Sequence, residues 1–192
     1  MPQITAVGFS GNITRPSKTH AFVSHIVSHF GGNGTSLPVF DIEDLGPSFP
    51  SARSTTNLDA KAAAIVNRIV EADLLVVGSP TFKGSYTGLF KHFFDLIDPA
   101  ALRGKPVILT ATGGGDRHSL MVEHQLRPLF GFFEALTMPT AIYASDQAFL
   151  NGVLVSEPIR LRVEQAVAEA RLALAARRAG TGDTRLPYSS AA

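Results

Sequence analysis

The sequence has no cysteine and no tryptophan, and no apolar run in it approaches the length of a membrane span. The absence of cysteine excludes disulfides, iron–sulfur clusters, cysteine-ligated zinc and a thiol nucleophile. A spanning helix needs about 20 consecutive apolar residues, so we expect no membrane association. The N-terminus lacks the basic and apolar segments of a secretory signal, and we therefore predict a cytoplasmic protein.

An excess of charge is also lacking. The 17 Lys and Arg residues nearly balance the 16 Asp and Glu residues, which leaves a formal net charge of +1. Nucleic-acid-binding domains are usually clearly basic, so we predict no nucleic-acid partner. A chain of 192 residues corresponds to one domain, which we place at residues 1–178. The tail at 179–192 contains Gly, Thr, Ser and Pro, and we expect it to be disordered.

Short apolar segments alternate with stretches of helical periodicity along the chain. We expect strands at residues 4–8, 37–42, 74–78, 106–111 and 140–144. We expect helices around residues 22–30, 60–72, 89–97, 118–136 and 157–178. This alternation predicts an α/β protein with a parallel sheet and helices on both faces. Pro38 suggests an edge position for the second strand, Pro128 should bend or bulge the fourth helix, and residues 145–156 should form a long loop.

Ligands of such sheets bind beyond the carboxyl ends of the strands, which directs attention to three loops. The first runs from Ser10 to Thr19, where hydroxyls, backbone N–H groups and a helix dipole can converge on an anion. Arg15 and Lys18 add positive charge. The loop has neither dinucleotide nor triphosphate glycine motifs, so a single terminal phosphate suits it. The alternative is that Ser17 only caps a helix and the two cations are solvated.

The second loop runs from Ser79 to Gly88. Gly84 permits positive φ or close backbone approach, and Phe82 and Tyr86 supply flat apolar surface. These features suit an aromatic heterocycle such as a flavin, although the aromatic residues could instead belong to the core. In the third loop, residues 112–118, three glycines leave the backbone open to a planar ring. Two basic residues end that loop and could meet a second anionic ligand: Arg117 and His118.

Together these loops resemble those of the NADPH-dependent FMN reductases of flavodoxin-like fold. The likeness is greatest to members that feed reduced FMN to methanesulfonate and alkanesulfonate two-component monooxygenases, and it covers about residues 4–178. Segment 14–19 is similar to that family's FMN-phosphate loop, and 79–91 resembles its isoalloxazine loop and following helix. Segment 111–118 resembles its third flavin-facing loop, which also lies near the pyridine nucleotide, and segment 124–130 matches as well.

The resemblance implies a flavodoxin-like five-stranded sheet of order 2-1-3-4-5 and an NAD(P)H:FMN oxidoreductase. FMN and NADPH are the implied ligands, and hydride passes between the two rings without a catalytic acid or base from the protein. The implied acceptor of reduced FMN is a sulfonate-type monooxygenase. The implied cofactor-binding residues are Ser10, Arg15, Ser17, Lys18, Thr19, Pro80, Thr81, Phe82, Lys83, Gly84, Ser85, Thr112, Gly113, Gly114, Gly115, Arg117 and His118.

Six phenylalanines on the third and fourth predicted helices exceed what a single buried stripe needs. They are Phe90, Phe93, Phe94, Phe130, Phe132 and Phe133. We therefore expect a subunit interface there, in a homodimer or homotetramer. By resemblance, alkanesulfonate-type members carry a tyrosine in a π-bulge of the fourth helix, and the position matches His124 here. His25 and His29 have the spacing of a metal pair but lack a third ligand, so we predict no metal site.

Three other functions compete with this reading. An FMN-retaining quinone or azo reductase would keep its flavin bound. A flavodoxin-type electron carrier would lack an NADPH site, but such carriers are usually strongly acidic, and the net charge of +1 is against it. A regulator that binds a phosphate without a flavin would neither turn yellow with FMN nor oxidise NADPH.

We predict that the substitution Arg15→Ala weakens FMN binding by about 1.5–3 kcal/mol, the contribution of a charged hydrogen bond. Titration of the flavin-free protein with FMN measures this effect. Wild-type affinity in the variant would show that Arg15 does not hold the FMN phosphate.

Overall fold

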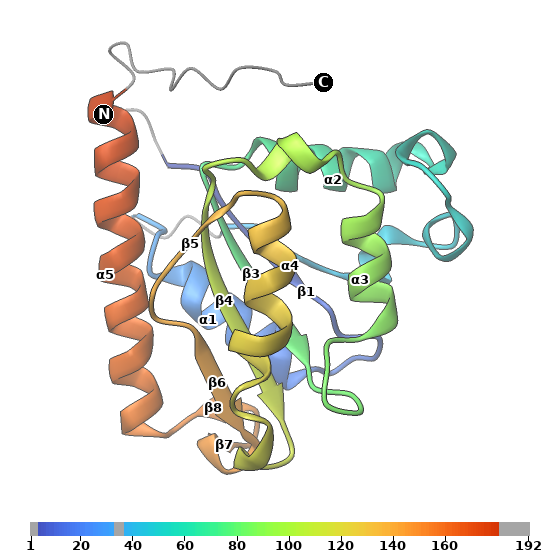
Figure 1. The fold of residues 1–192 in the computed structure, drawn as a ribbon. Helices are drawn as coiled ribbons and strands as arrows, with labels where there is room; N and C mark the ends of the chain where they lie inside the picture. Colours follow the sequence, from blue (N-terminus) through green and yellow to red (C-terminus); the bar gives the residue numbers. More distant parts are fainter. Residues whose placement is uncertain (1–3, 33–36, 181–192) are drawn as a thin grey trace.

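A parallel sheet organises the chain in the computed structural model, which describes residues 4–32 and 37–180 (Figure 1). The strands follow the order β2-β1-β3-β4, and β4 pairs on its other side with both β5 and β6. The strands are β1 (Ala6–Ser10), β2 (Val39–Asp41), β3 (Leu74–Pro80), β4 (Pro106–Gly113), β5 (Leu136–Thr137) and β6 (Ile142–Ser145). Central β3 is buried on both faces, which explains why its sequence is apolar without alternation.

The first four strands have the predicted order, and the edge position of β2 is confirmed. The strand predicted at 140–144 is present as β6, but the predicted count of five strands is wrong, because the short strand β5 also pairs with β4. The chain leaves the ladder between them at Pro139, which has no N–H to donate. The Thr140 N–H donates instead to Glu169 Oε2 in the last helix, at 2.9 Å.

Helices cover both faces of the sheet, as predicted (Figure 1). α1 and α5 pack on one face, whereas α2, α3 and α4 pack on the other. The helices are α1 (Lys18–Ser28), α2 (Ala60–Glu71), α3 (Gly88–Asp95), α4 (Arg127–Phe132) and α5 (Glu157–Gly180). The face predicted for the second helix is confirmed, since Ala62, Ile65, Val66 and Ile69 are all buried.

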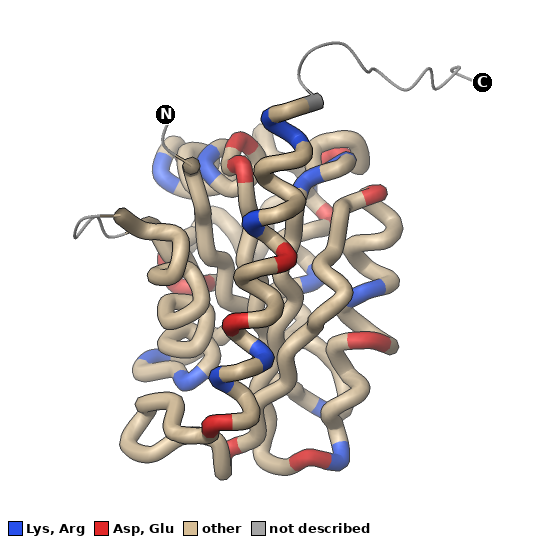
Figure 2. Tube along the Cα trace, turned by 90° about the vertical axis from the view of Figure 1, so that its left-hand side faces the viewer, with Lys and Arg blue, Asp and Glu red and all other residues tan. Residues whose placement is uncertain are grey.

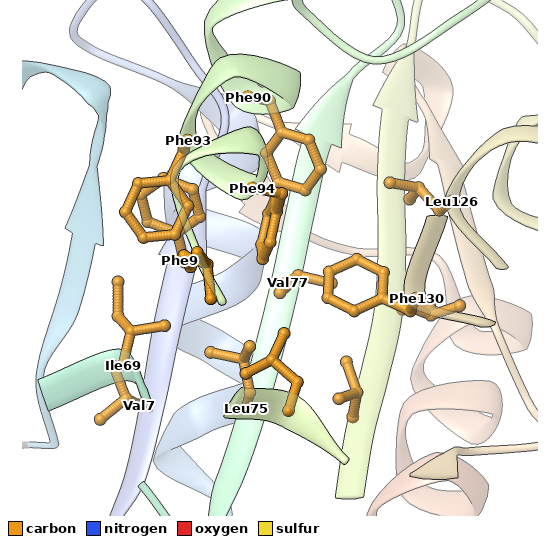
Figure 3. Close-up of a cluster of buried hydrophobic side chains, with 14 of the residues drawn as sticks. Val7, Phe9, Ile69, Leu75, Val77, Phe90, Phe93, Phe94, Leu126 and Phe130 are labelled. Carbon is orange, nitrogen blue, oxygen red and sulfur yellow. The ribbon is translucent and has the colours of Figure 1, made fainter. Parts of the chain in front are cut away.

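Aromatic rings fill the core on the side of α3 and α4 (Figure 3). Phe9 of β1 stacks on Phe93 with ring centroids 4.1 Å apart, and Phe94 meets Phe130 edge-on at 4.8 Å. Five of the six phenylalanines predicted for an interface are therefore core residues, because they pack around Phe9 and one another. Only Phe132 among them is exposed, at 69%.

The fourth helix is shorter and less regular than predicted. A π-helical turn at Val122–Leu126 precedes α4, so the bulge expected near Pro128 is present. The helix does not reach residue 136. It ends because Glu134 adopts a positive φ of 52° and the Ala135 N–H turns back to the Phe130 carbonyl at 3.1 Å.

The loop predicted at 145–156 contains a hairpin, which corrects that expectation. β7 (Phe149–Leu150) pairs antiparallel with β8 (Val153–Leu154). The turn residues Asn151 and Gly152 both have positive φ, as a tight two-residue hairpin requires.

The last helix continues two residues into the predicted tail, and the rest of that tail, 181–192, lies outside the described residues. On the side of the molecule in Figure 2, basic and acidic residues are interspersed, and neither sign gathers into one large patch. Within residues 4–32 and 37–180, none of the helices combines the length and the apolar character that crossing a membrane requires.

Two glycines set how closely the helices approach the carboxyl ends of the central strands. A Cβ at Gly78 of β3 would lie 2.5 Å from Val23 Cγ2 of α1, and a Cβ at Gly11 would lie 2.6 Å from the Phe90 ring of α3. Neither position can accept a side chain without displacing its neighbour. The starts of α1 and α3 are thereby held against the sheet edge where the candidate site lies.

Candidate functional site

The three loops singled out in the sequence meet at one edge of the sheet. Parallel pairing aligns the strand ends, with Ser10 beside Gly78 and Ser79 beside Ala111. A cavity of about 280 Å³ lies between the loops. Its lining comprises residues 12–14 and 16–19 of the first loop, 80–82 of the second, 112–114 of the third, and Asp146 after β6.

One end of the cavity is the N-terminus of α1. Ser17 caps this helix, and its Oγ accepts from the His20 N–H at 3.2 Å, so the capping role considered above is confirmed. The N–H groups of Lys18 and Thr19 lie in the first turn, where a helix offers them no acceptor. The Thr19 hydroxyl lies 2.7 Å from that of Thr112, which joins the first loop to the third. This end presents the donors that an anion needs.

The two cations of the first loop both form ion pairs, although each side chain remains about half exposed to solvent. Lys18 Nζ lies 2.7 Å from Asp146 Oδ1 at the cavity, and both side chains are about half exposed. Arg15 does not line the cavity. Its Nε donates to Asp41 Oδ2 at 2.7 Å, and its Nη2 lies 2.9 Å from Asp44 Oδ2.

The Asp41 carboxylate anchors the first loop through hydrogen bonds. Its side chain is fully buried at the end of β2, where it accepts from Asn12 Nδ2 at 3.0 Å as well as from Arg15. Asn12 in turn accepts from the buried Ser10 hydroxyl at 2.6 Å and donates to the Thr14 carbonyl at 3.1 Å. Ser10 therefore supports the loop and does not line the cavity.

Ionisation of Asp41 follows from these contacts. Burial raises its pKa, but the hydrogen bonds from Arg15 and Asn12 outweigh burial and lower the pKa below the usual value. A lowered pKa means that the carboxylate stabilises the fold above its unfolded-state pKa and loses that effect as the pH falls through the folded-state pKa. Asp41 was not among the predicted site residues, although its place at the carboxyl end of a predicted strand was a signal.

The second loop presents Pro80, Thr81 and Phe82 to the cavity, and the Phe82 ring is half exposed at its mouth. Phe82 and Ser85 exchange two backbone hydrogen bonds of 2.8 and 3.1 Å. Lys83 and Gly84 form the turn between them with positive φ.

This turn carries Lys83, Gly84 and Ser85 away from the cavity lining. Ser85 Oγ contacts Gln125 Oε1 of the π-helical turn at 3.0 Å instead.

Thr87 connects the second loop to the first. Its hydroxyl donates to the Gly11 carbonyl at 2.7 Å and accepts from the Phe90 N–H at 3.3 Å, which caps α3. Its own N–H donates to Ser79 Oγ at 3.2 Å. Tyr86 packs its ring 5.8 Å from that of Phe90, so this aromatic residue belongs in part to the core, as the alternative reading proposed.

The third loop brings bare backbone to the cavity. A Cβ at Gly114 would meet no atom within 4 Å, so this position faces open space beside the cavity. A Cβ at Gly113 would lie 2.2 Å from the Tyr143 hydroxyl, which donates to the Gly115 carbonyl at 2.8 Å. Burial raises the pKa of Tyr143. The next turn, Asp116–His118, carries Arg117 exposed and His118 half-buried, both outside the cavity lining.

Comparison with known proteins agrees with this geometry. Residues 4–149 match the NADPH-dependent FMN reductase family. The chain belongs to this family. It is 42% identical to an FMN reductase (NADPH) of Pseudomonas aeruginosa over 168 residues, which cover 85% of this chain and 89% of that protein.

A second relative and a solved structure extend the match. The chain is 40% identical to an NADH-dependent FMN reductase, SfnF, of Pseudomonas fluorescens over 171 residues, 87% of this chain and 90% of that protein. The crystal structure of an oxidoreductase from Corynebacterium diphtheriae superposes with a TM-score of 0.77 at 30% identity, covering 91% of this chain and 98% of the other.

As an FMN reductase, the chain is an oxidoreductase that uses FMN and NAD(P)H. The cavity fits FMN in kind. A helix N-terminus with hydroxyls suits the phosphate, and the open space at Gly114 beside Phe82 suits a planar ring. Small-molecule sites usually measure about 300–1,000 Å³, and this cavity of about 280 Å³ lies at the lower end of that range.

We predict that Asp41→Asn lowers the free energy of unfolding by about 1–3 kcal/mol, because a buried acceptor of charged hydrogen bonds is lost. FMN binding should weaken in parallel as the first loop loses this anchor. Urea unfolding and flavin titration measure the two effects. Asp44→Asn, at the less buried carboxylate, serves as the control and should have the smaller effect. Wild-type stability and flavin affinity in Asp41→Asn would contradict this role.

Proposed function

We propose that this FMN reductase draws hydride from NADPH and releases reduced FMN to a two-component monooxygenase of the sulfonate type. The supporting observation is the cavity, which joins an anion-binding helix terminus to an open, glycine-lined face. An open mouth suits a flavin that enters and leaves. The choice of acceptor rests on the resemblance of segments 14–19, 79–91 and 111–118 to reductases of sulfonate monooxygenases.

The phosphate of FMN is assigned to the start of α1. Ser17, Lys18 and Thr19 line that end of the cavity and supply a hydroxyl, an ammonium and backbone N–H groups. Arg15 acts indirectly, since its guanidinium is bound by Asp41 and Asp44 and so fixes the loop that precedes the helix.

The ring of FMN is assigned to the second and third loops, where Phe82 and Gly114 border the open mouth. Arg117 and His118 stand beyond it and are assigned to the anionic groups of NADPH, where the next bound ligand would lie. FMN supplies the redox chemistry by accepting a hydride from the nicotinamide. The protein contributes by orienting the two rings and needs no acid or base of its own.

A subunit interface is assigned to the face between α3 and α4. A cavity of about 530 Å³ lies there, lined in part by Tyr86, Leu129 and the exposed Phe132. His124 of the π-helical turn also lines it. Covering this apolar surface favours association of two copies.

We predict that purified, flavin-stripped protein oxidises NADPH only when FMN is added, and that turnover continues with FMN in large excess over enzyme. The loss of NADPH absorbance measures the rate, and NADH in a parallel assay tests the donor. Tight FMN binding without oxidation would indicate an electron carrier instead. Activity that saturates at one bound flavin and needs a quinone or azo acceptor would indicate an FMN-retaining reductase.

We predict that Phe132→Asp shifts the protein from an oligomer toward the monomer, because a charge would replace the exposed ring at the proposed interface. Light scattering at micromolar concentration measures the mass. Leu172→Asp, at an equally exposed position on α5, is the matched control and should leave the mass unchanged. A monomeric mass for the wild type would contradict the proposed interface.

A further inference from the structure

A carboxylate stands beside the cation of the proposed phosphate site. Asp146 follows β6 and lines the cavity together with Lys18, at 2.7 Å from its ammonium nitrogen. Among the described lining residues, Lys18 is the one Lys or Arg and Asp146 the one Asp or Glu. Their formal charges cancel. Attraction for an anion therefore comes from the helix terminus and the hydroxyls, without a net positive charge at the cavity.

We propose that Asp146 lowers the affinity for the FMN phosphate, so that FMN exchanges as a substrate and is not retained. This inference rests on the function proposed above. A phosphate monoester carries about −1.5 to −2 charges at pH 7. To pair with Lys18 it must displace or share Asp146, and it then lies beside a second anion.

The size of the effect follows from the exposure of the pair. Side chains that are 46% and 52% exposed interact in a medium close to water, where the repulsion of a nearby carboxylate is small but measurable. For a doubly charged phosphate about 5 Å from the carboxylate in water, the unscreened repulsion corresponds to about a 15-fold change in affinity, and screening at low ionic strength reduces it to about 5- to 10-fold. Salt screens such exposed charges, so the effect must shrink as ionic strength rises.

The alternative is that the Lys18–Asp146 ion pair only links the carboxyl end of β6 to the start of α1. An exposed ion pair contributes little to stability. Loss of a purely structural link would change the affinity for all flavins equally, whereas electrostatic repulsion changes only the affinity for flavins that carry a phosphate. Riboflavin, which has the same ring but no phosphate, therefore separates the two.

The test compares FMN and riboflavin dissociation constants, from flavin fluorescence titrations, for wild type and Asp146→Asn at low salt and at about 0.5 M NaCl. We expect the variant to bind FMN about 5- to 10-fold more tightly at low salt, with a smaller gain at high salt and unchanged riboflavin affinity. Glu134→Gln removes a carboxylate from another exposed ion pair, with Arg103, and should change neither constant.

The possible outcomes distinguish the role of Asp146 from the proposed reductase function. Unchanged or weaker FMN binding in Asp146→Asn, or an equal change for riboflavin, would overturn the role of Asp146 while the reductase assignment stands. A wild type that neither binds FMN nor oxidises NADPH with it would overturn the proposed function and this inference with it. In a Lys18→Gln background, the gain from Asp146→Asn should persist, because direct repulsion of the phosphate does not need Lys18.

Discussion

The parallel, in-register pairing of β1, β3 and β4 is the constraint on which the rest of the site depends. It ends three strands at one level, and backbone hydrogen bonds from Gly11 to Gly78 and from Thr81 to Thr112 continue the alignment into the loops. Gly78 and Gly11 then admit α1 and α3 so closely that the helix starts border the same edge. Anion donors and open backbone are thereby brought together by main-chain geometry, before any charged side chain contributes.

Charge in this site is arranged by compensation. The Arg15 guanidinium of the first loop is bound by two carboxylates, and that of Asp41 is fully buried. The nearby Lys18 ammonium is bound by a third carboxylate, on Asp146. The loop is thus held in shape by ion pairs while the cavity itself stays electrically balanced. At the proposed phosphate site, dipoles and hydrogen bonds are therefore the main source of attraction for an anion. That site differs in this respect from a site that grips its ligand with unpaired cations.

The sequence pattern predicted those features of the fold that depend on residues close together in the chain. The central strand, the buried face of α2, the edge position of β2 and the bulge near Pro128 were all readable, because each depends on neighbours within a few residues. Asp41 and Asp146 were missed because their partners lie far along the chain, on other elements. The split of the fifth strand had a visible cause in Pro139, but the capture of the Thr140 N–H by Glu169 did not. The phenylalanines were overcounted for an interface because Phe9, on a distant strand, needed them as partners.

Thr87 links the first and second loops of the candidate site. Its hydroxyl caps the start of α3 and donates to the Gly11 carbonyl, so the first and second loops share a hydrogen-bond network. Breaking that network frees groups on both loops at once. We therefore expect the two loops to open as one cooperative unit in native-state hydrogen exchange, even though Gly11 and Thr87 lie 76 positions apart in the sequence.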